Sequence, residues 1–184
     1  MRRTASLERK TRETNVSVKL ALDGTGTSKV RTDDPFLTHM LEALARHANL
    51  DLDVEASGDL PHHLVEDTAL VLGRALREAL GTESVERIAS DVVPMDEALV
   101  MVALDLEPRP YYAGPVPMAL FDHFLRTFAF EARIALHVRV LASGEEHHVV
   151  EAAFKALARA LRRAAAPKAG EMSTKGREAL RKSD

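Results

Sequence analysis

The sequence predicts an α+β fold that is internally duplicated, with two similar sheet-and-helix halves packed about a pseudo-twofold axis. Short segments of the first half recur in the same order 82 to 86 residues later. Patterns typical of strands and helices also follow the same order in both halves. Because no linker rich in Gly, Ser or Pro divides them, we expect halves at residues 1–88 and 89–184 that form one structural unit.

Four pairs of segments define the repeat. In chain order they are Ala21-Leu-Asp23 with Ala103-Leu-Asp105, His39-Met-Leu41 with His123-Phe-Leu125, Ala56-Ser-Gly58 with Ala142-Ser-Gly144, and His62-His63-Leu-Val-Glu66 with His147-His148-Val-Val-Glu151. A single match would be chance. Four matches in one order, at a nearly constant offset, indicate a duplication.

Each half is expected to contain strands and helices in the same order. An alternating, partly β-branched strand begins at Asn15, and turn residues at 23–26 precede a second strand. The short loops between strands favour antiparallel pairing. The remaining predicted elements are a helix at 36–48, a strand at 50–55 and a helix at 62–80 that ends at Gly81, then a strand at 98–105, a helix at 117–130, a strand at 133–141 and a helix at 147–165.

The composition excludes several classes of function. Lys and Arg number 25 against 28 Asp and Glu, and this slightly acidic balance argues against nucleic-acid binding and against an electrostatic membrane anchor. The chain has no cysteine, so imidazole and carboxylate groups would have to hold any metal. Its apolar runs are far shorter than the roughly 20 residues that span a bilayer, and no signal-peptide core follows the N-terminus. We therefore expect a cytoplasmic enzyme.

A His-His-x-x-Glu motif occurs twice and is the main candidate for chemistry. His62 and Glu66 lie four residues apart at the start of a helix, so they share one face and can chelate one ion. His63 points about 100° around the helix and can reach a second ion if two such helices pack together. The second copy of the motif consists of His147, His148 and Glu151.

Two further histidines are candidates for a fourth ligand at each ion. His39 and His137 each lie one helix or strand upstream of a His-His pair. His123 occupies the position equivalent to His39 in the repeat, and we interpret it as structural. One exposed His-His pair is usually polar surface, but two pairs in register favour a metal such as Mn, Zn, Fe or Co. A non-catalytic metal site stays open, although two ions with only N and O ligands are more typical of catalysis.

Six motifs extend this pattern across the chain. They are Thr11-Arg-Glu-Thr14, Phe36-Leu-Thr-His-Met-Leu41, Pro94-Met-Asp-Glu-Ala-Leu99, Arg109-Pro-Tyr111, His147-His-Val-Val-Glu-Ala-Ala-Phe-Lys155 and Ser173-Thr-Lys-Gly176. In these residues the chain resembles the imidazoleglycerol-phosphate dehydratase family over nearly its whole length. The resemblance implies halves with a ferredoxin-like, or ribosomal-protein-S5-domain-2-like, fold.

The resemblance also implies a function and its cofactors. Members of this family convert imidazoleglycerol phosphate to imidazole acetol phosphate in histidine biosynthesis, and they are carbon–oxygen lyases (hydro-lyases). They assemble as homo-24-mers with manganese at subunit interfaces, which implies two Mn²⁺ per subunit here. One ion would be held by His39, His63, His147 and Glu151, and the other by His62, Glu66, His137 and His148.

The remaining site residues also come from the resemblance. Glu13 would be the carboxylate that moves the proton. His39 would contact the substrate as well as the metal. His47 lies about two turns after it and either lines the substrate pocket or caps its helix. The positions implied for binding the substrate phosphate are Arg87, Arg109, Lys155, Ser173 and Lys175.

Two alternatives stay open on the sequence. One is a different metal-dependent enzyme on the same scaffold, such as a hydrolase of a phosphorylated substrate; the retained Glu13 and Lys155 argue against it. The other is a non-catalytic, metal-clamped assembly protein descended from the dehydratase. Its support is that the loops before His62 and His147 are shorter than the family pattern.

Overall fold

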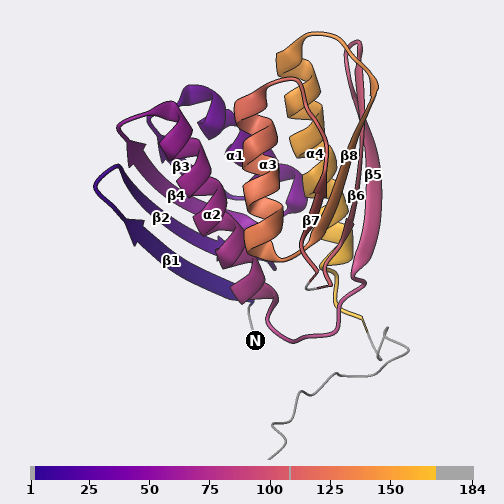
Figure 1. Ribbon diagram of the computed structural model, residues 1–184. Coiled ribbons are helices and arrows are strands. Elements are labelled where there is room, and N and C mark those ends of the chain that lie inside the picture. Colours follow the sequence, from indigo (N-terminus) through magenta and orange to yellow (C-terminus); the bar gives the residue numbers. More distant parts are fainter. Residues whose placement is uncertain (1–2, 108, 169–184) are drawn as a thin grey trace, which may run out of the picture.

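Two four-stranded sheets enclose four helices in the computed structural model, which describes residues 3–107 and 109–168. Figure 1 shows the sheets on the left and right of the molecule with the helices between them. The layers are therefore sheet, helices, helices and sheet. No helix among the described residues is long and apolar enough to cross a membrane.

The two sheets have the same topology. The first has the order β1-β2-β4-β3 and the second the order β5-β6-β8-β7. This architecture confirms the predicted α+β class with two similar halves. The strands of the first sheet are β1 (Thr4–Lys10), β2 (Thr14–Ala21), β3 (Ser28–Thr32) and β4 (Asp51–Gly58); those of the second are β5 (Ile88–Met95), β6 (Ala98–Asp105), β7 (Tyr111–Ala113) and β8 (Ala135–Ala142).

The expectation of antiparallel pairing is wrong for one strand of each sheet. β3 pairs with β4 in parallel, and β7 pairs with β8 in parallel, whereas the other pairs are antiparallel. The cause is the helix that follows β3 and the helix that follows β7. Each helix carries the chain back along the sheet, so the next strand runs in the same direction as the one before it.

Four helices fill the space between the sheets. α2 packs against α3 and α1 packs against α4, so every helix contacts a helix of the other half. The sheets bury alternate residues against them, including Val16, Val18 and Leu20 of β2. Each fully buried side chain of this size contributes about 1.5–3 kcal/mol. The helices are α1 (Pro35–Ala48), α2 (Pro61–Leu80), α3 (Ala119–Ala132) and α4 (Glu146–Ala164).

Local sequence explains where α1 starts and stops. The side chain of Asp34 accepts a hydrogen bond from the Leu37 amide at 2.8 Å, and Pro35 follows at the first helical position. Asn49 ends the helix in the left-handed region, with φ of 55°. These caps fix the two ends of α1, whose second turn carries His39 toward Glu151 of α4.

Three strands were not predicted, namely β1, β5 and β7. All three lie at the edges of their sheets. Their side chains are mostly exposed or half-buried, so the alternation that marks a half-buried strand is weak. Pairing with a neighbouring strand, rather than local pattern, determines these segments.

Candidate active site

Both His-His-x-x-Glu motifs lie in the first turns of long helices, α2 and α4. Their four-residue spacing brings the first histidine toward the glutamate, as helix geometry requires. The distance from His62 Nε2 to Glu66 Oε2 is 3.5 Å, and that from His147 Nε2 to Glu151 Oε2 is 3.1 Å. The motifs therefore present two imidazole–carboxylate pairs at the helix N-termini.

A first group joins α1 to α4. His39 Nε2 lies 3.2 Å from Glu151 Oε2, the oxygen that also contacts His147. Lys155 contacts the other carboxylate oxygen at 2.8 Å. Burial raises the pKa of Glu151, but hydrogen bonds and charge from Lys155 and His39 outweigh it, so the pKa falls to about 2. His39, His147 and Glu151 offer ligand atoms within 4.8 Å of one another, so this group could hold a metal ion.

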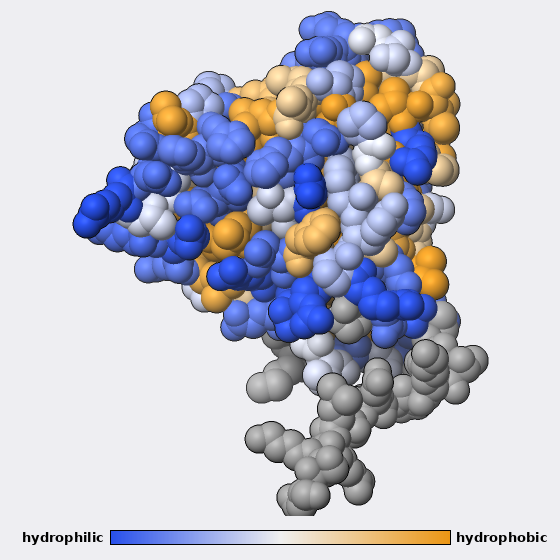
Figure 2. All heavy atoms as spheres, viewed as in Figure 1, coloured by the Kyte–Doolittle hydropathy of each residue, from blue (hydrophilic) through white to orange (hydrophobic). Residues whose placement is uncertain are grey.

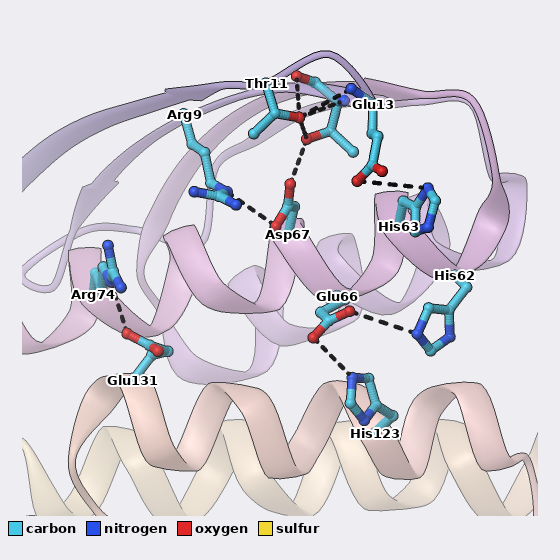
Figure 3. Close-up of polar contacts among 11 residues, drawn as sticks. Arg9, Thr11, Glu13, His62, His63, Glu66, Asp67, Arg74, His123 and Glu131 are labelled. Atoms are coloured by element: carbon cyan, nitrogen blue, oxygen red, sulfur yellow. Dashed lines mark hydrogen bonds and ion pairs between the residues drawn. The ribbon is translucent and has the colours of Figure 1, made fainter.

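A second group joins α2 to α3. His123 Nε2 lies 3.3 Å from Glu66 Oε1, while the other carboxylate oxygen faces His62 (Figure 3). The rings of His62 and His123 stack at 5.2 Å. This trio also offers three ligand atoms within 4.8 Å of one another. His123 was interpreted as structural; the match between His39-Met-Leu41 and His123-Phe-Leu125 was the signal that it belongs beside this glutamate.

The second histidine of each motif contacts other residues: His63 faces the loop before α2, and His148 faces the hairpin between β5 and β6. His63 Nδ1 is 2.8 Å from Asp59 Oδ1, and this hydrogen bond raises the pKa of His63. His148 Nδ1 is 3.2 Å from Glu97, whose hydrogen bond likewise raises the pKa of His148. Asp96, Glu97 and His148 form a third group of potential ligands. Asp96 and Glu97 lie in the Pro94–Leu99 motif, but no spacing or periodicity in the sequence points to them as site residues.

Within one chain, the structure brings together part of each predicted ligand set. His39, His147 and Glu151 form one group without His63, and His62 and Glu66 form another without His148 or His137. The alternation of β8 explains the position of His137. Leu136 and Val138 are buried against the helices, so His137 between them points to the outer face of the sheet, where its ring lies 5.3 Å from that of Tyr111.

Glu13 lies in the turn between β1 and β2, beside the first motif. Its carboxylate is 3.9 Å from His63 Nδ1 (Figure 3). The Thr11 hydroxyl accepts hydrogen bonds from the amides of Glu13 and Thr14, which fixes the turn. Thr14 in turn donates to buried Asp67 of α2, which also accepts from Arg9 Nε at 3.0 Å. This network connects the hairpin that carries Glu13 to α2.

Two of the predicted phosphate-binding residues lie at the other end of the second sheet. Arg87 Nε is 3.0 Å from Asp105, and its Nη1 donates to Glu107 at 2.7 Å. Arg109 lies 4.0 Å from Asp105, and its side chain is 77% exposed. Since β5 runs from next to Arg87 to the hairpin that contacts His148, its eight residues separate these arginines from that histidine by about 25 Å.

The other predicted substrate-binding residues are nearer to the first group or outside the described chain. Lys155 contacts Glu151 directly. His47 is half-buried near the end of α1, where burial lowers its pKa and the positive charges of Lys155 and Arg159 lower it further. The predicted residues Ser173 and Lys175 lie outside the described residues.

The chemistry of the two groups fits a divalent ion of borderline hardness. Each combines two imidazoles with one carboxylate and contains no sulfur ligand. His123 Nε2 is buried and forms no hydrogen bond with any described residue, although it faces Glu66. An unpartnered ring nitrogen directed at a carboxylate is the arrangement that an ion between them would satisfy.

Comparison with known proteins places these residues in a family context. The family model described as imidazoleglycerol-phosphate dehydratase matches residues 32–161. A protein of that name from Kineococcus radiotolerans is 50% identical, with 96% of this chain and 99% of that protein covered. Another from Desulfitobacterium hafniense is 48% identical, with 86% and 88% covered.

Solved structures agree with the sequence comparison. The imidazoleglycerol-phosphate dehydratase of Pyrococcus furiosus, in complex with (S)-C348, superposes with a TM-score of 0.83 at 36% identity and covers 92% of this chain and 99% of its own. The enzyme of Staphylococcus aureus gives a TM-score of 0.80 at 30% identity, over 90% and 99% of the chains. The predicted family, and with it the class of hydro-lyase, is confirmed: the chain belongs to the imidazoleglycerol-phosphate dehydratase family.

Proposed function

We propose that the protein catalyses the manganese-dependent dehydration of imidazoleglycerol phosphate to imidazole acetol phosphate, a step of histidine biosynthesis in the cytoplasm. The observation that carries the proposal is that two groups of two histidines and one glutamate lie at helix N-termini, and that Glu13 lies 3.9 Å from His63 of the α2 motif. Its relatives, named for this activity, cover nearly the whole chain.

Glu13 is proposed to move the proton. Dehydration removes hydroxide from the carbon attached to the imidazole and a proton from the neighbouring carbon, which keeps its hydroxyl group, and the resulting enol becomes the ketone. The exposed carboxylate of Glu13 is free to approach such a carbon. The hydrogen bonds of Thr11 and the pair formed by Thr14 and Asp67 hold its turn in position.

The ligands are proposed to hold two Mn²⁺, although iron, zinc or cobalt would accept the same donors. When bound to the imidazole of the substrate, such an ion would stabilise negative charge on the ring, and the ring could then expel hydroxide from the carbon attached to it. We propose the sets His39, His63, His147 and Glu151 for one ion and His62, Glu66, His137 and His148 for the other. The first histidine and the glutamate of each motif come from one helix.

The remaining ligands are proposed to come from other copies of the chain. The side chain of His137 points away from the helices of its own subunit. It can therefore bind only an ion that lies at the contact with another copy of the chain. Arg87 and Arg109, proposed to bind the substrate phosphate with Lys155, Ser173 and Lys175, are likewise distant from their own His148. A site shared between subunits accounts for both observations, and His47 then lines the same pocket beside Lys155.

Self-association has support in the surface of the second sheet. Ile88, Val92, Tyr111 and Leu141, all in this sheet, are large hydrophobic residues with exposed side chains. Figure 2 shows hydrophobic residues gathered over the right-hand side of the molecule, where this sheet lies. An apolar face that also carries His137 is suited to bury itself against another copy. We propose the homo-24-mer of the family, with residues 1–88 and 89–184 as the repeated units of each subunit.

The deciding experiment is turnover of imidazoleglycerol phosphate by purified protein that has been stripped with a chelator and refilled with manganese. We expect no activity in the stripped protein and recovery with Mn²⁺. Metal uptake without turnover would instead support the non-catalytic assembly protein.

A further inference from the structure

Arg87, one of the residues proposed to bind the substrate phosphate, is already paired with two carboxylates of its own chain. Its Nη1 donates to Glu107 at 2.7 Å, and its Nη2 donates to Asp105 at a longer 3.4 Å. The buried Nε lies 3.0 Å from Asp105, but it forms no hydrogen bond with any described residue. Glu107 is therefore the closest anionic partner of this guanidinium.

The backbone holds Arg87 in place independently of these carboxylates. Its φ is 70°, in the left-handed region that residues other than glycine seldom adopt. Its amide donates to the Ala164 carbonyl at 2.8 Å, and its carbonyl accepts from the Leu106 amide at 3.0 Å. Residues held in such conformations by their surroundings cluster at ligand-binding sites. The arginine side chain thus starts from a fixed point between the end of α4 and the end of β6.

The two carboxylates differ in how firmly the structure holds them. Asp105 accepts a hydrogen bond from the Glu107 amide at 3.0 Å in addition to its contacts with Arg87. The Glu107 side chain is 36% exposed, and Arg87 is its only ion-pair partner in the part of the chain that the structure describes. Rotation of the Glu107 side chain into water breaks this contact and leaves the backbone unchanged. Asp105 is therefore a fixed partner of Arg87, whereas Glu107 is displaceable.

A phosphate group that binds Arg87 has to take the place of Glu107. Both groups direct negatively charged oxygens at the same guanidinium, so they repel each other when both are present. A phosphate dianion carries more charge and more acceptor oxygens than a carboxylate, which favours phosphate in the exchange. Because Glu107 belongs to the same chain, its effective concentration at Arg87 is high, on the order of millimolar for tethered groups. Glu107 is thus a built-in competitor of the phosphate.

We propose that Glu107 sets the affinity for the substrate phosphate, because it occupies Arg87 until the phosphate displaces it. The proposal rests on the assignment of Arg87 to phosphate binding in the proposed function. It has the consequence that the loss of an acidic side chain strengthens substrate binding, and that this gain depends on Arg87.

The test is calorimetric titration of the full-length, manganese-loaded protein with inorganic phosphate. We expect Glu107→Gln, which keeps the size of the side chain and removes its charge, to bind phosphate about tenfold more tightly than the unmodified protein. Glu86→Gln is the matched control, since the Glu86 carboxylate pairs with Lys168 at 2.9 Å rather than with Arg87. Its phosphate affinity should stay within about twofold of that of the unmodified protein.

A double-mutant cycle tests whether the effect passes through Arg87. Arg87→Ala removes the group for which Glu107 and phosphate compete. In the Arg87→Ala protein, the further change Glu107→Gln should therefore alter the phosphate affinity by less than about twofold. A tenfold gain that persists without Arg87 would overturn the competition. Glu107→Ser replaces the glutamine variant in the cycle if that variant does not fold by circular dichroism.

Displacement also has a direct structural readout. A crystal structure of the unmodified protein with bound phosphate should show the Glu107 carboxylate rotated away from Arg87, with Asp105 still in contact with the guanidinium. A phosphate bound to Arg87 with the contact between Glu107 and Arg87 intact would overturn the proposal.

Turnover of imidazoleglycerol phosphate separates this proposal from the function on which it rests. In an active enzyme, Glu107→Gln should lower the KM by about tenfold and leave kcat within about threefold. Tighter phosphate binding by this variant in a protein without turnover supports the role of Glu107 and overturns the enzymatic proposal. Turnover with equal phosphate affinity in the variant and the unmodified protein overturns the role of Glu107 alone. Failure of both proteins to bind phosphate overturns the assignment of Arg87 and, with it, the role of Glu107.

Discussion

The ammonium group of Lys155 lies 2.8 Å from the Glu151 carboxylate, which also faces His39 and His147. A fixed positive charge at a carboxylate competes with a cation for that carboxylate. At this distance the Coulomb interaction between two unit charges is roughly 6 kcal/mol at an effective dielectric constant of about 20. Lys155 therefore opposes the binding of a metal ion at the first group, while its ammonium group can bind an anionic group of the substrate.

Replacing Lys155 with Met should strengthen manganese binding at the first group by about tenfold, because it removes this competing charge. The same change should raise the KM for imidazoleglycerol phosphate, because the phosphate loses a cation. Calorimetry gives the first quantity and steady-state kinetics the second. Lys155→Arg, which keeps the charge, is the control and should change manganese affinity much less. Equal affinity in the Met variant and the unmodified protein would mean that Lys155 does not oppose the ion.

Manganese should stabilise the folded protein through the two groups. An ion at about 100 times its Kd adds about 2.7 kcal/mol per site, which corresponds to a Tm rise of about 5–10 °C for a chain of this size. Differential scanning fluorimetry of the stripped protein with increasing MnCl2 measures it. Glu66→Gln should lose part of the rise, because it weakens only one site. The metal assignment fails if the Tm does not depend on manganese.

Glu13→Gln should lower kcat by about 10²–10⁴ while leaving manganese binding unchanged, because the amide cannot accept the proton. The side chain is exposed and contacts His63 only at 3.9 Å, so the fold should tolerate the change. Rapid-quench or steady-state assays on the manganese-loaded variant give the rate. Glu8→Gln, in the strand that precedes the same turn, is the matched control. A kcat near that of the unmodified enzyme would remove Glu13 from the reaction.

A shared site predicts complementation between two inactive variants. Glu13→Gln and Arg109→Ala should each be impaired alone, since one lacks the proton carrier and the other a phosphate contact. When the two are unfolded together and reassembled, about a quarter of the sites should receive an intact Glu13 from one subunit and an intact Arg109 from another. Activity near that fraction of the unmodified rate is expected. Mixtures no more active than the separate variants would indicate that both residues act within one chain.

The ionised carboxylate of Asp23 should stabilise the fold through its contact with Arg3, and this stabilisation should disappear at acidic pH. Its carboxylate accepts hydrogen bonds from Arg3, which is 8% exposed and also donates to the Ala165 carbonyl at 2.7 Å. The hydrogen bond from Arg3 lowers the pKa of Asp23 below its usual value of 3.8. A depressed pKa means that the stabilisation is present above about pH 4 and disappears as the pH falls through the folded-state pKa.

Asp23→Asn should therefore lower the free energy of unfolding by about 1–2 kcal/mol at pH 7, because Arg3 loses its charged partner and Asp23 is partly screened by solvent. Urea titrations from pH 7 to pH 3 measure the difference between the two proteins. The difference in the free energy of unfolding should decrease toward zero as the pH approaches 3. A difference that is independent of pH would show that the ion pair is not its source.

The sequence alone determined the elements and motifs that depend on local pattern. The β6 strand at 98–105 was predicted with its observed bounds, and the ends of the four helices were predicted within two residues. Apolar periodicity and caps are properties of neighbouring residues, so a single chain contains the information. The pairing of His62 with Glu66 followed in the same way from the geometry of one helix.

Tertiary structure decided what depends on residues far apart in the chain. The edge strands β1, β5 and β7 exist because a neighbouring strand pairs with them, and the parallel direction of β3 and β7 follows from the helices that come after them. The position of His123 beside Glu66 depends on α3 packing against α2, a contact between the two halves. Spacing in the sequence determines the relative positions of side chains on one helix. Only the packing between helices determines which side chains of the two halves come into contact.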